Sequence, residues 1–157
     1  MVSFEFLAII VSVLGLAASI TYYAIILSNA NKTRKAQLFM SLQQRFDNPQ
    51  LMGALIQSRD YTDLSFEEWY EKYGPNTNRE VYTDWVCLQN AIQGIGLLVE
   101  SKQVDAKMES NLMGSIITLN WERSGPIIIG MRKRLGREEV WNQVEELNTL
   151  LLSLDNR

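Results

Sequence analysis

The sequence contains no histidine and only one cysteine in 157 residues. The absence of histidine excludes Ser-His-Asp and Cys-His nucleophile systems, a histidine general base and any metal site that depends on imidazole. The single Cys87 cannot form an intramolecular disulfide and fits a reducing compartment. Because it lies between Val86 and Leu88 in an apolar segment, we interpret Cys87 as a small buried hydrophobe and not as a reactive thiol.

An excess of positive charge is also missing. With 15 basic and 18 acidic residues the net charge is −3, whereas a general nucleic-acid binder needs a clear basic excess to contact phosphates. The glycines at 94–96 and 125–130 lack the Lys-Ser/Thr pair or the strand context of a phosphate-binding loop. We therefore predict no catalytic residue, no metal site, no cofactor and no nucleic-acid partner, and we assign no small-molecule ligand.

The chain does have one long apolar segment, residues 2–28, with no charged side chain from Phe6 to Leu27. These 22 residues would form a helix of roughly 33 Å, enough to cross a hydrocarbon core of about 30 Å. A cleavable export signal would begin with basic residues, which are missing here, and a buried core helix of this length rarely lacks charge. We predict that residues 1–28 form a retained transmembrane anchor.

Basic residues follow the apolar segment directly. Lys32, Arg34 and Lys35 come after it, whereas the acidic Glu5 is the charged side chain before it. Under the positive-inside rule this bias places the following residues in the cytosol. We therefore predict a single-pass protein of the cell (inner) membrane, with its N-terminus outside and its C-terminal domain in the cytosol.

Small residues follow one face of the predicted span and would let a second helix approach closely. They are spaced by 4, 3 and 4 positions: Ala8, Ser12, Gly15 and Ser19. Since small residues are frequent in membrane spans, chance spacing is the alternative to a helix-association site.

Helical spacing of apolar residues continues through the rest of the chain, without an alternating strand pattern or a two-residue hairpin signal. The first helix is predicted to run on to about Phe46, so residues 29–47 form a helical connector continuous with the span. Residues 48–157 then form one cytosolic helical domain. Its first helix, over residues 50–59, is expected to turn three apolar residues inward: Leu51, Leu55 and Ile56.

Capping and stop signals predict where the next helices begin and end. Ser65 and Glu68 fit a capping box, and Gly74, which tolerates a left-handed cap, would end that helix before Pro75. Asn78 is a candidate N-cap for a long helix to about Ser101. The apolar seam of that helix is stepped by 4, 3, 4, 3 and 4 positions: Val81, Trp85, Leu88, Ile92, Ile95 and Val99.

A further helix is expected after Asp105, and Pro126 should kink or break it, because proline removes a backbone donor and clashes with the preceding turn. Gly136 is a candidate C-cap. A last helix carries Val140, Val144, Leu147, Leu151 and Leu154. We predict an all-α fold: one N-terminal transmembrane helix followed by a small cytosolic bundle of about five to six helices.

Two groups of charged residues invite a functional interpretation. Glu67, Glu68 and Glu71 could act as paired carboxylates, but without histidine ligands we expect a solvated face with Glu68 in the capping box. Asp84, Glu122 and Arg123 could equally form a buried polar network, although spacing alone does not place them together.

The basic residues could contact anionic lipid headgroups, a favourable contact near a membrane surface. For those near the end of the long helix before Gly136, the alternative is placement at the negative end of the helix dipole. The lipid-headgroup candidates are Lys32, Arg34, Lys35, Arg132, Lys133, Arg134 and Arg137.

The segments occur in a characteristic order. A single span is followed by NKTRKAQLFMSLQQRF, FEEWYEKYGPNTN, a long helix ending GIGLLVESKQVD, the pair Trp121-Glu122, Pro126, MRKRLG and a final tryptophan-bearing helix. Over nearly the whole chain this order resembles a prokaryotic family of single-span membrane proteins known only as a domain of unknown function. The resemblance implies an inner-membrane anchor with a cytosolic helical domain and supplies no catalytic residue. At Ser124-Gly125, where we expect bulkier residues, the chain departs from the family.

The leading hypothesis is a non-enzymatic, single-pass membrane protein whose helical domain self-associates or serves as an accessory subunit of a larger membrane complex. Its expected partners are the lipid bilayer and a protein, either foreign or a second copy. The alternative is a membrane-tethered regulatory or sensor module in which the connection at 27–46 transmits a response to a ligand or lipid. An enzyme at the membrane surface, a less favoured third hypothesis, would have to use carboxylates, lysine or tyrosine.

Overall fold

The structure is a computed structural model that describes residues 3–155, apart from the side chains of residues 108, 112 and 155. Every regular element in this range is a helix, so the all-α prediction is confirmed. The chain divides into two compact units, Met1–Leu38 and Phe39–Arg157.

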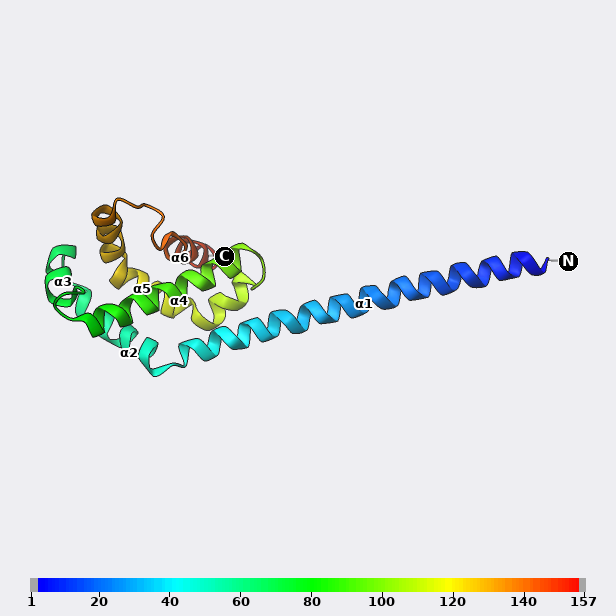
Figure 1. Cartoon of the computed structure of the whole chain (residues 1–157), viewed down its shortest axis with the longest axis horizontal. Coiled ribbons are helices and arrows are strands. Elements are labelled where there is room, and N and C mark those ends of the chain that lie inside the picture. The colour runs from blue at the N-terminus through cyan, green and yellow to red at the C-terminus, as the bar shows by residue number, and fades with distance from the viewer. Residues whose placement is uncertain (1–2, 156–157) are drawn as a thin grey trace. The chain divides into compact units, whose positions relative to one another are not determined.

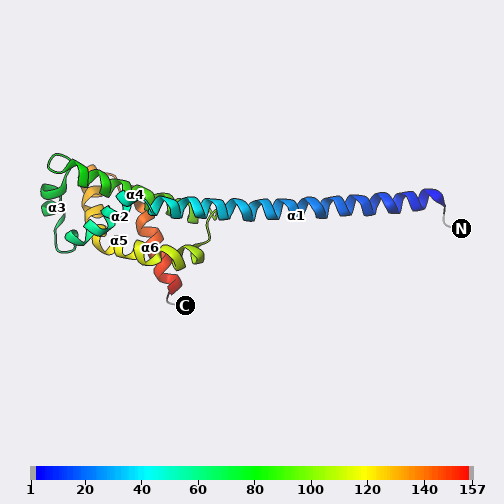
Figure 2. The same cartoon turned by 90° about the horizontal axis from the view of Figure 1, so that it is seen from below.

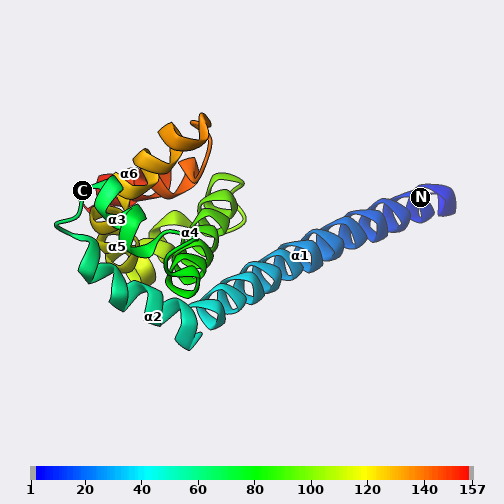
Figure 3. The same ribbon diagram turned by 60° about the vertical axis from the view of Figure 1, so that its left-hand side comes forward.

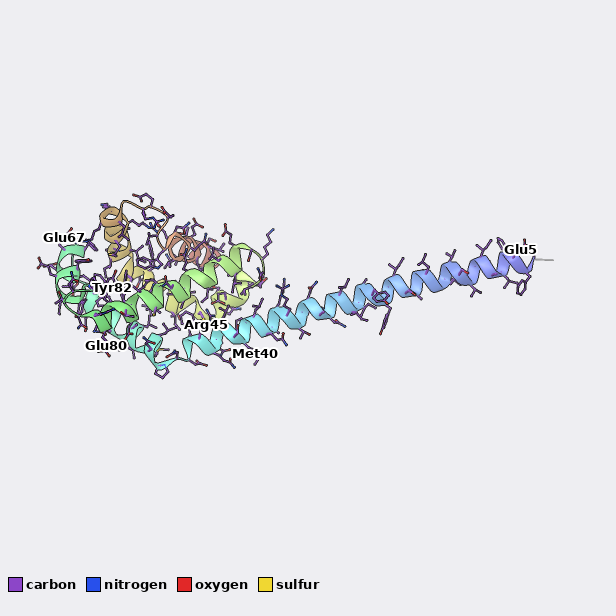
Figure 4. The ribbon with its side chains drawn as sticks, viewed as in Figure 1. Glu5, Met40, Arg45, Glu67, Glu80 and Tyr82 are labelled. Carbon is purple, nitrogen blue, oxygen red and sulfur yellow. The ribbon has the colours of Figure 1, made fainter. Side chains whose placement is uncertain are left out.

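The first helix, α1 (Phe4–Phe46), is one uninterrupted helix of 43 residues. At 1.5 Å per residue it is roughly 65 Å long, about twice the thickness of a hydrocarbon core. Its apolar side chains between Phe6 and Leu27 are exposed, and the helix is long and apolar enough to cross a membrane (Figure 1). Glu5 lies in its first turn (Figure 4), and the helix continues to Phe46 as predicted.

In the second unit, the last turns of α1 are followed by five α-helices and one 3-10 helix, in agreement with the predicted five to six helices. They are α2 (Pro49–Gln57), η1 (Ser58–Tyr61), α3 (Phe66–Tyr73), α4 (Arg79–Glu100), α5 (Ala106–Leu135) and α6 (Asn142–Asp155). α4 packs against α2 and α6, and α6 runs across α5 (Figure 2). Figure 3 shows α2 beside α4 from another side.

Local capping signals define where these helices begin. The capping box is present: Ser65 Oγ accepts from the Glu68 amide, while the Glu68 carboxylate accepts from the Ser65 amide at 2.8 Å. Asn78 Oδ1 accepts from the Val81 amide at 3.3 Å at the start of α4, and Asp105 Oδ1 from the Lys107 amide at 3.0 Å at the start of α5. The predicted N-caps are therefore confirmed.

The end of α3 differs in detail from the prediction. The helix stops at Tyr73, but Gly74 has φ −65° and ψ 167°, an extended conformation and not a left-handed cap. The physical reason is Pro75, because proline pushes the preceding residue into extended backbone.

The apolar seam predicted on α4 forms the centre of the core, with Trp85, Leu88, Ile92 and Ile95 fully buried. The prediction for α2 is wrong at Ile56, whose side chain is 57% exposed. Residues three and four apart share a helix face, so a face that contains Leu51 takes Ala54 and Leu55 and leaves Ile56 outside. On α6, three of the predicted apolar positions are buried: Val144, Leu147 and Leu151.

α5 runs through Pro126 without a break. Glu122 and Pro126 are both exposed, so water can bond to the Glu122 carbonyl that loses its usual helical donor. A Cβ at Gly125 would lie 3.2 Å from the Trp121 ring, which accounts for the small residue there. Gly136 is left-handed at φ 64°, and the Arg137 amide donates back to the Arg132 carbonyl, as in a Schellman C-cap.

Candidate functional site

A buried cluster of polar side chains joins α4 to α5. Gln89 and Asn120 exchange two hydrogen bonds: Gln89 Nε2 donates to Asn120 Oδ1 at 3.1 Å, and Asn120 Nδ2 donates to Gln89 Oε1 at 2.9 Å. Trp85 Nε1 donates to Ser124 Oγ at 3.1 Å, and Ser124 Oγ donates to Asn120 Oδ1 at 3.4 Å. All four side chains are fully buried. We name these four residues the central polar cluster.

The side chains of the central polar cluster satisfy one another by hydrogen bonds. Every side-chain nitrogen and oxygen in it has a hydrogen-bond partner, so the cost of burying these atoms is offset. None of its four residues titrates near neutral pH, so Ser124 has no base within the cluster to activate it. The cluster can fix how α4 and α5 pair, because each amide fits one partner position.

A buried network of Asp84, Glu122 and Arg123 was one open interpretation of the sequence, and the structure does not bring these three side chains together. Asp84 accepts from Gln50 Nε2 at 2.5 Å on the surface, and Glu122 is exposed. Arg123 Nη1 donates to the Leu55 carbonyl at 3.4 Å, and so ties α5 to the end of α2. The central polar cluster was missed because its partners on α4 and α5 lie 31 to 39 residues apart along the chain, so no local pattern connects them.

Arg132 takes part in the packing of the domain. Its side chain is turned inward, with Nε donating to the Val140 carbonyl at 2.8 Å and Nη1 to Glu145 at 2.7 Å. Arg132 is therefore the one lipid-headgroup candidate whose side chain is buried among the described residues. Its partners lie in the turn after Gly136 and on α6, so the spacing of residues along α5 does not predict these bonds.

Three other basic residues lie near Arg132 in the sequence, and their side chains are exposed: Lys133, Arg134 and Arg137. The guanidinium of Arg134 lies 4.0 Å from the centre of the Tyr70 ring, and Arg137 pairs with Glu139 at 3.0 Å. Lys32, Arg34 and Lys35 on α1 are exposed as well. Of the seven lipid-headgroup candidates, these six keep side chains that solvent can reach.

Ala8, Ser12, Gly15 and Ser19 of α1 are exposed. A Cβ atom added at Gly15 would meet no atom within 4 Å. Ser12 Oγ donates to the Ala8 carbonyl and Ser19 Oγ to the Gly15 carbonyl, each at 2.8 Å. The hydroxyl groups are thus satisfied inside the helix, which leaves a smooth surface of small side chains.

The acidic residues of α3 are all exposed, and one of them caps the helix. Glu68 accepts from the Ser65 amide and hydroxyl, which lowers the pKa of its carboxyl. Glu67 lies at the outer edge of α3 (Figure 4), and Glu71 is exposed. Within residues 3–155, no group of three or more His, Cys, Asp or Glu side chains could hold a metal ion.

The surface of the domain has shallow depressions. An apolar hollow of about 130 Å³ is lined by Phe39, Gln43, Phe46, Asp47, Met52, Met113 and Ile116. A more open groove of about 520 Å³ contains Cys87 together with polar side chains such as Arg45 and Asn90. Cys87 is half-buried, so the expectation that it is a buried hydrophobe is only partly correct.

Sequence reasoning missed Glu109, in the first turn of α5. Its side chain is fully buried, and neither carboxyl oxygen has a hydrogen-bond partner among the described residues. Burial raises the pKa of this carboxyl, because desolvation penalises the charged form. One signal could have identified it: Glu109 lies one helical turn before Met113, on the face of α5 that continues through Ile117 and Asn120.

The chain belongs to the family described as a domain of unknown function, DUF4760, which it matches over residues 4–149. This match confirms the resemblance to a family of unknown function. No curated protein and no solved structure matches the chain.

Proposed function

We propose that this chain is a single-pass membrane protein that works by associating with protein and not by catalysis. In this proposal α1 crosses the cell membrane with its N-terminus outside, and the helical domain lies in the cytosol. The partner is a second copy of the chain or a larger membrane complex to which the chain is an accessory subunit.

One observation about α1 carries the membrane part of the proposal. Within its apolar segment Ser12, Ser19 and Thr21 each donate to the carbonyl four residues earlier, at 2.8 Å. A hydrocarbon core offers no water to bond a hydroxyl, so a helix that lies in lipid must satisfy such groups itself. The segment meets this requirement, and its apolar side chains are exposed.

The charges outside the segment support the proposed orientation. Lys32, Arg34 and Lys35 come just after it and are exposed, as expected for residues facing a cytosolic leaflet. In the proposal these cations contact anionic headgroups. Lys133, Arg134 and Arg137 remain additional headgroup candidates.

Two surfaces support association. The face of Ala8, Ser12, Gly15 and Ser19 would let another helix approach closely, since its side chains are small and its hydroxyl groups are already bonded. On the domain, the apolar hollow includes two methionines, Met52 and Met113, whose flexible side chains adapt to different partners.

Substitution of Gly15 tests self-association through α1. Gly15→Leu should weaken association of the full-length chain in a membrane dimerisation assay by roughly tenfold, about 1.4 kcal/mol, because the bulk separates the helix backbones. Ala17→Leu is the matched control, since residue 17 lies on the opposite side of the helix. Equal signals from the wild type and both variants would reject this contact.

Affinity isolation of the full-length chain from native membranes in mild detergent separates the two forms of the proposal. A stoichiometric foreign chain identifies an accessory subunit, and an oligomer of this chain alone identifies self-association. A monomer without any co-purifying protein, together with an unaffected Gly15→Leu variant, would refute association altogether.

A further inference from the structure

The chain reverses tightly between α4 and α5, in a segment that we name the α4–α5 corner, residues 101–109. Two amides, those of Gln103 and Val104, donate to the same Leu98 carbonyl at 2.9 and 3.1 Å. Lys102 adopts the left-handed φ of 57°, and Val104 is buried. A non-glycine residue in this conformation is held by its surroundings, so the corner depends on the packing around it.

Glu109, the last residue of this segment, has a buried side chain. It has no exposed surface, and both of its carboxyl oxygens lack a partner within the described residues. An ionised carboxylate in such a position would be far more costly than a neutral carboxyl group, since neither water nor a donor compensates it. The closed corner is therefore compatible with the protonated form of Glu109.

The charged groups near Glu109 do not change this conclusion. Glu100, Lys102, Asp105 and Lys107 are all exposed, and burial is the one cause that raises the pKa of the Glu109 carboxyl. On α6, which packs on α5, Glu145 is already paired with Arg132, and Glu146 is exposed. η1 and α3 also pack on α5, and their charged side chains are likewise exposed: Arg59, Asp60, Glu67, Glu68, Glu71 and Lys72. On α4, which the central polar cluster joins to α5, Arg79 and Glu80 are exposed and Asp84 is bonded to Gln50. At the end of α1, which lines the apolar hollow together with Met113, Arg45 and Asp47 are exposed.

We propose that the α4–α5 corner is a proton-dependent latch, which stays closed while Glu109 carries its proton and opens when Glu109 loses it. Opening lets water reach the carboxylate and uncovers Val104, which is buried in the closed corner. It also loosens the turn of α5 that holds Met113, one of the residues lining the apolar hollow. The latch goes beyond the proposed association and does not depend on it.

Hydrogen exchange of the full-length chain in detergent tests the latch. Backbone exchange is followed from pH 4 to pH 9 for the wild type and for Glu109→Gln, and the two rates are divided at each pH so that the intrinsic effect of pH cancels. In the corner this ratio should be close to one at the acidic end and rise by up to tenfold per pH unit once Glu109 loses its proton. In the middle of α4, around Leu88, it should stay close to one.

Two further variants keep the test decisive. Glu122→Gln changes an exposed carboxyl on the same helix and should leave the ratio at one throughout. Glu109→Leu replaces Glu109→Gln if the amide impairs folding, and the same rise is expected. A flat ratio in the corner would overturn the proposal, and so would an equal rise around Leu88, because that means global unfolding. Neither result bears on association, which is measured separately.

Discussion

The inner face of α5 contains buried polar groups in two different situations. At Asn120 and Ser124 each polar atom meets a donor or acceptor from α4 or from a neighbour on α5. At Glu109, toward the start of the same helix, both carboxyl oxygens are buried without a partner in the described part of the chain. The first situation stabilises one arrangement of two helices, whereas the second makes stability depend on protonation. Equally buried polar residues therefore affect stability in different ways, depending on whether they have hydrogen-bond partners.

The largest expected effect comes from breaking the central polar cluster at its amide pair. Asn120→Ala should lower the free energy of unfolding by about 3 kcal/mol, because it leaves the Gln89 amide buried without a partner. Denaturant unfolding of the full-length chain in detergent, followed by tryptophan fluorescence, measures the change.

The control is Asn111→Ala, an exposed asparagine on the same helix, which should change stability by no more than about 0.5 kcal/mol. Replacing Gln89 and Asn120 together by leucine should cost less than the sum of the single replacements, since no amide is then left unpaired. Strictly additive costs would mean that the two amides do not act as a pair.

A smaller loss is expected from Ser124→Ala, about 1 to 2 kcal/mol, because it removes the acceptor of the buried Trp85 Nε1. The same unfolding measurement applies, with Ser115→Ala on the exposed side of α5 as the control. If both alanine variants are as stable as the wild type, the hydroxyl at position 124 contributes nothing to the cluster.

The smallest effect has the opposite sign. Glu109→Leu should raise the free energy of unfolding at neutral pH by about 1 kcal/mol, because it removes an unpartnered polar group from the core. Glu122→Leu at an exposed position is the control. A clear loss of stability in Glu109→Leu would show that the carboxyl has a favourable partner after all.

The increase in the free energy of unfolding that Glu109→Leu causes should also depend on pH. The pKa of Glu109 is raised in the folded chain, so the folded state holds this proton more tightly than the unfolded state. The contribution of this bound proton to the stability of the folded chain is fully present below the unfolded pKa of about 4.3. It is lost as the pH rises through the pKa of the folded chain. The difference between Glu109→Leu and the wild type should therefore grow from acidic to alkaline pH, and unfolding curves across that range measure it.

Much of the helical fold could be predicted because its signals are local. Ser65 with Glu68, and Asn78 with Val81, form their bonds within three residues along the chain. The α4 seam follows directly from helical periodicity, and so does the burial of Leu88 and Ile92. The error at Ile56 arose where a helix of nine residues offers too few turns for periodicity to define its inner face.

The polar sites could not be predicted in the same way. Arg132 looked like one more exposed cation, yet its partners are the Val140 carbonyl and Glu145, beyond the turn at Gly136. Glu109 looked like an ordinary acidic residue in a first helical turn, where acidic residues are favourable on the surface. Only the packing of other elements on that turn made it a buried group.

Residues close together along the chain were therefore enough to predict the long apolar helix, the capped helix starts and the apolar seam of α4, because each depends on residues within about one or two helical turns. Which buried polar side chains find a hydrogen-bond partner depends on the tertiary packing. The bonds of the central polar cluster that join α4 to α5 connect residues 31 to 39 positions apart, and whether a buried group finds a partner depends on how helices meet in space. That difference separates the Gln89–Asn120 pair, which holds two helices together, from Glu109, which leaves the first turn of α5 dependent on one proton.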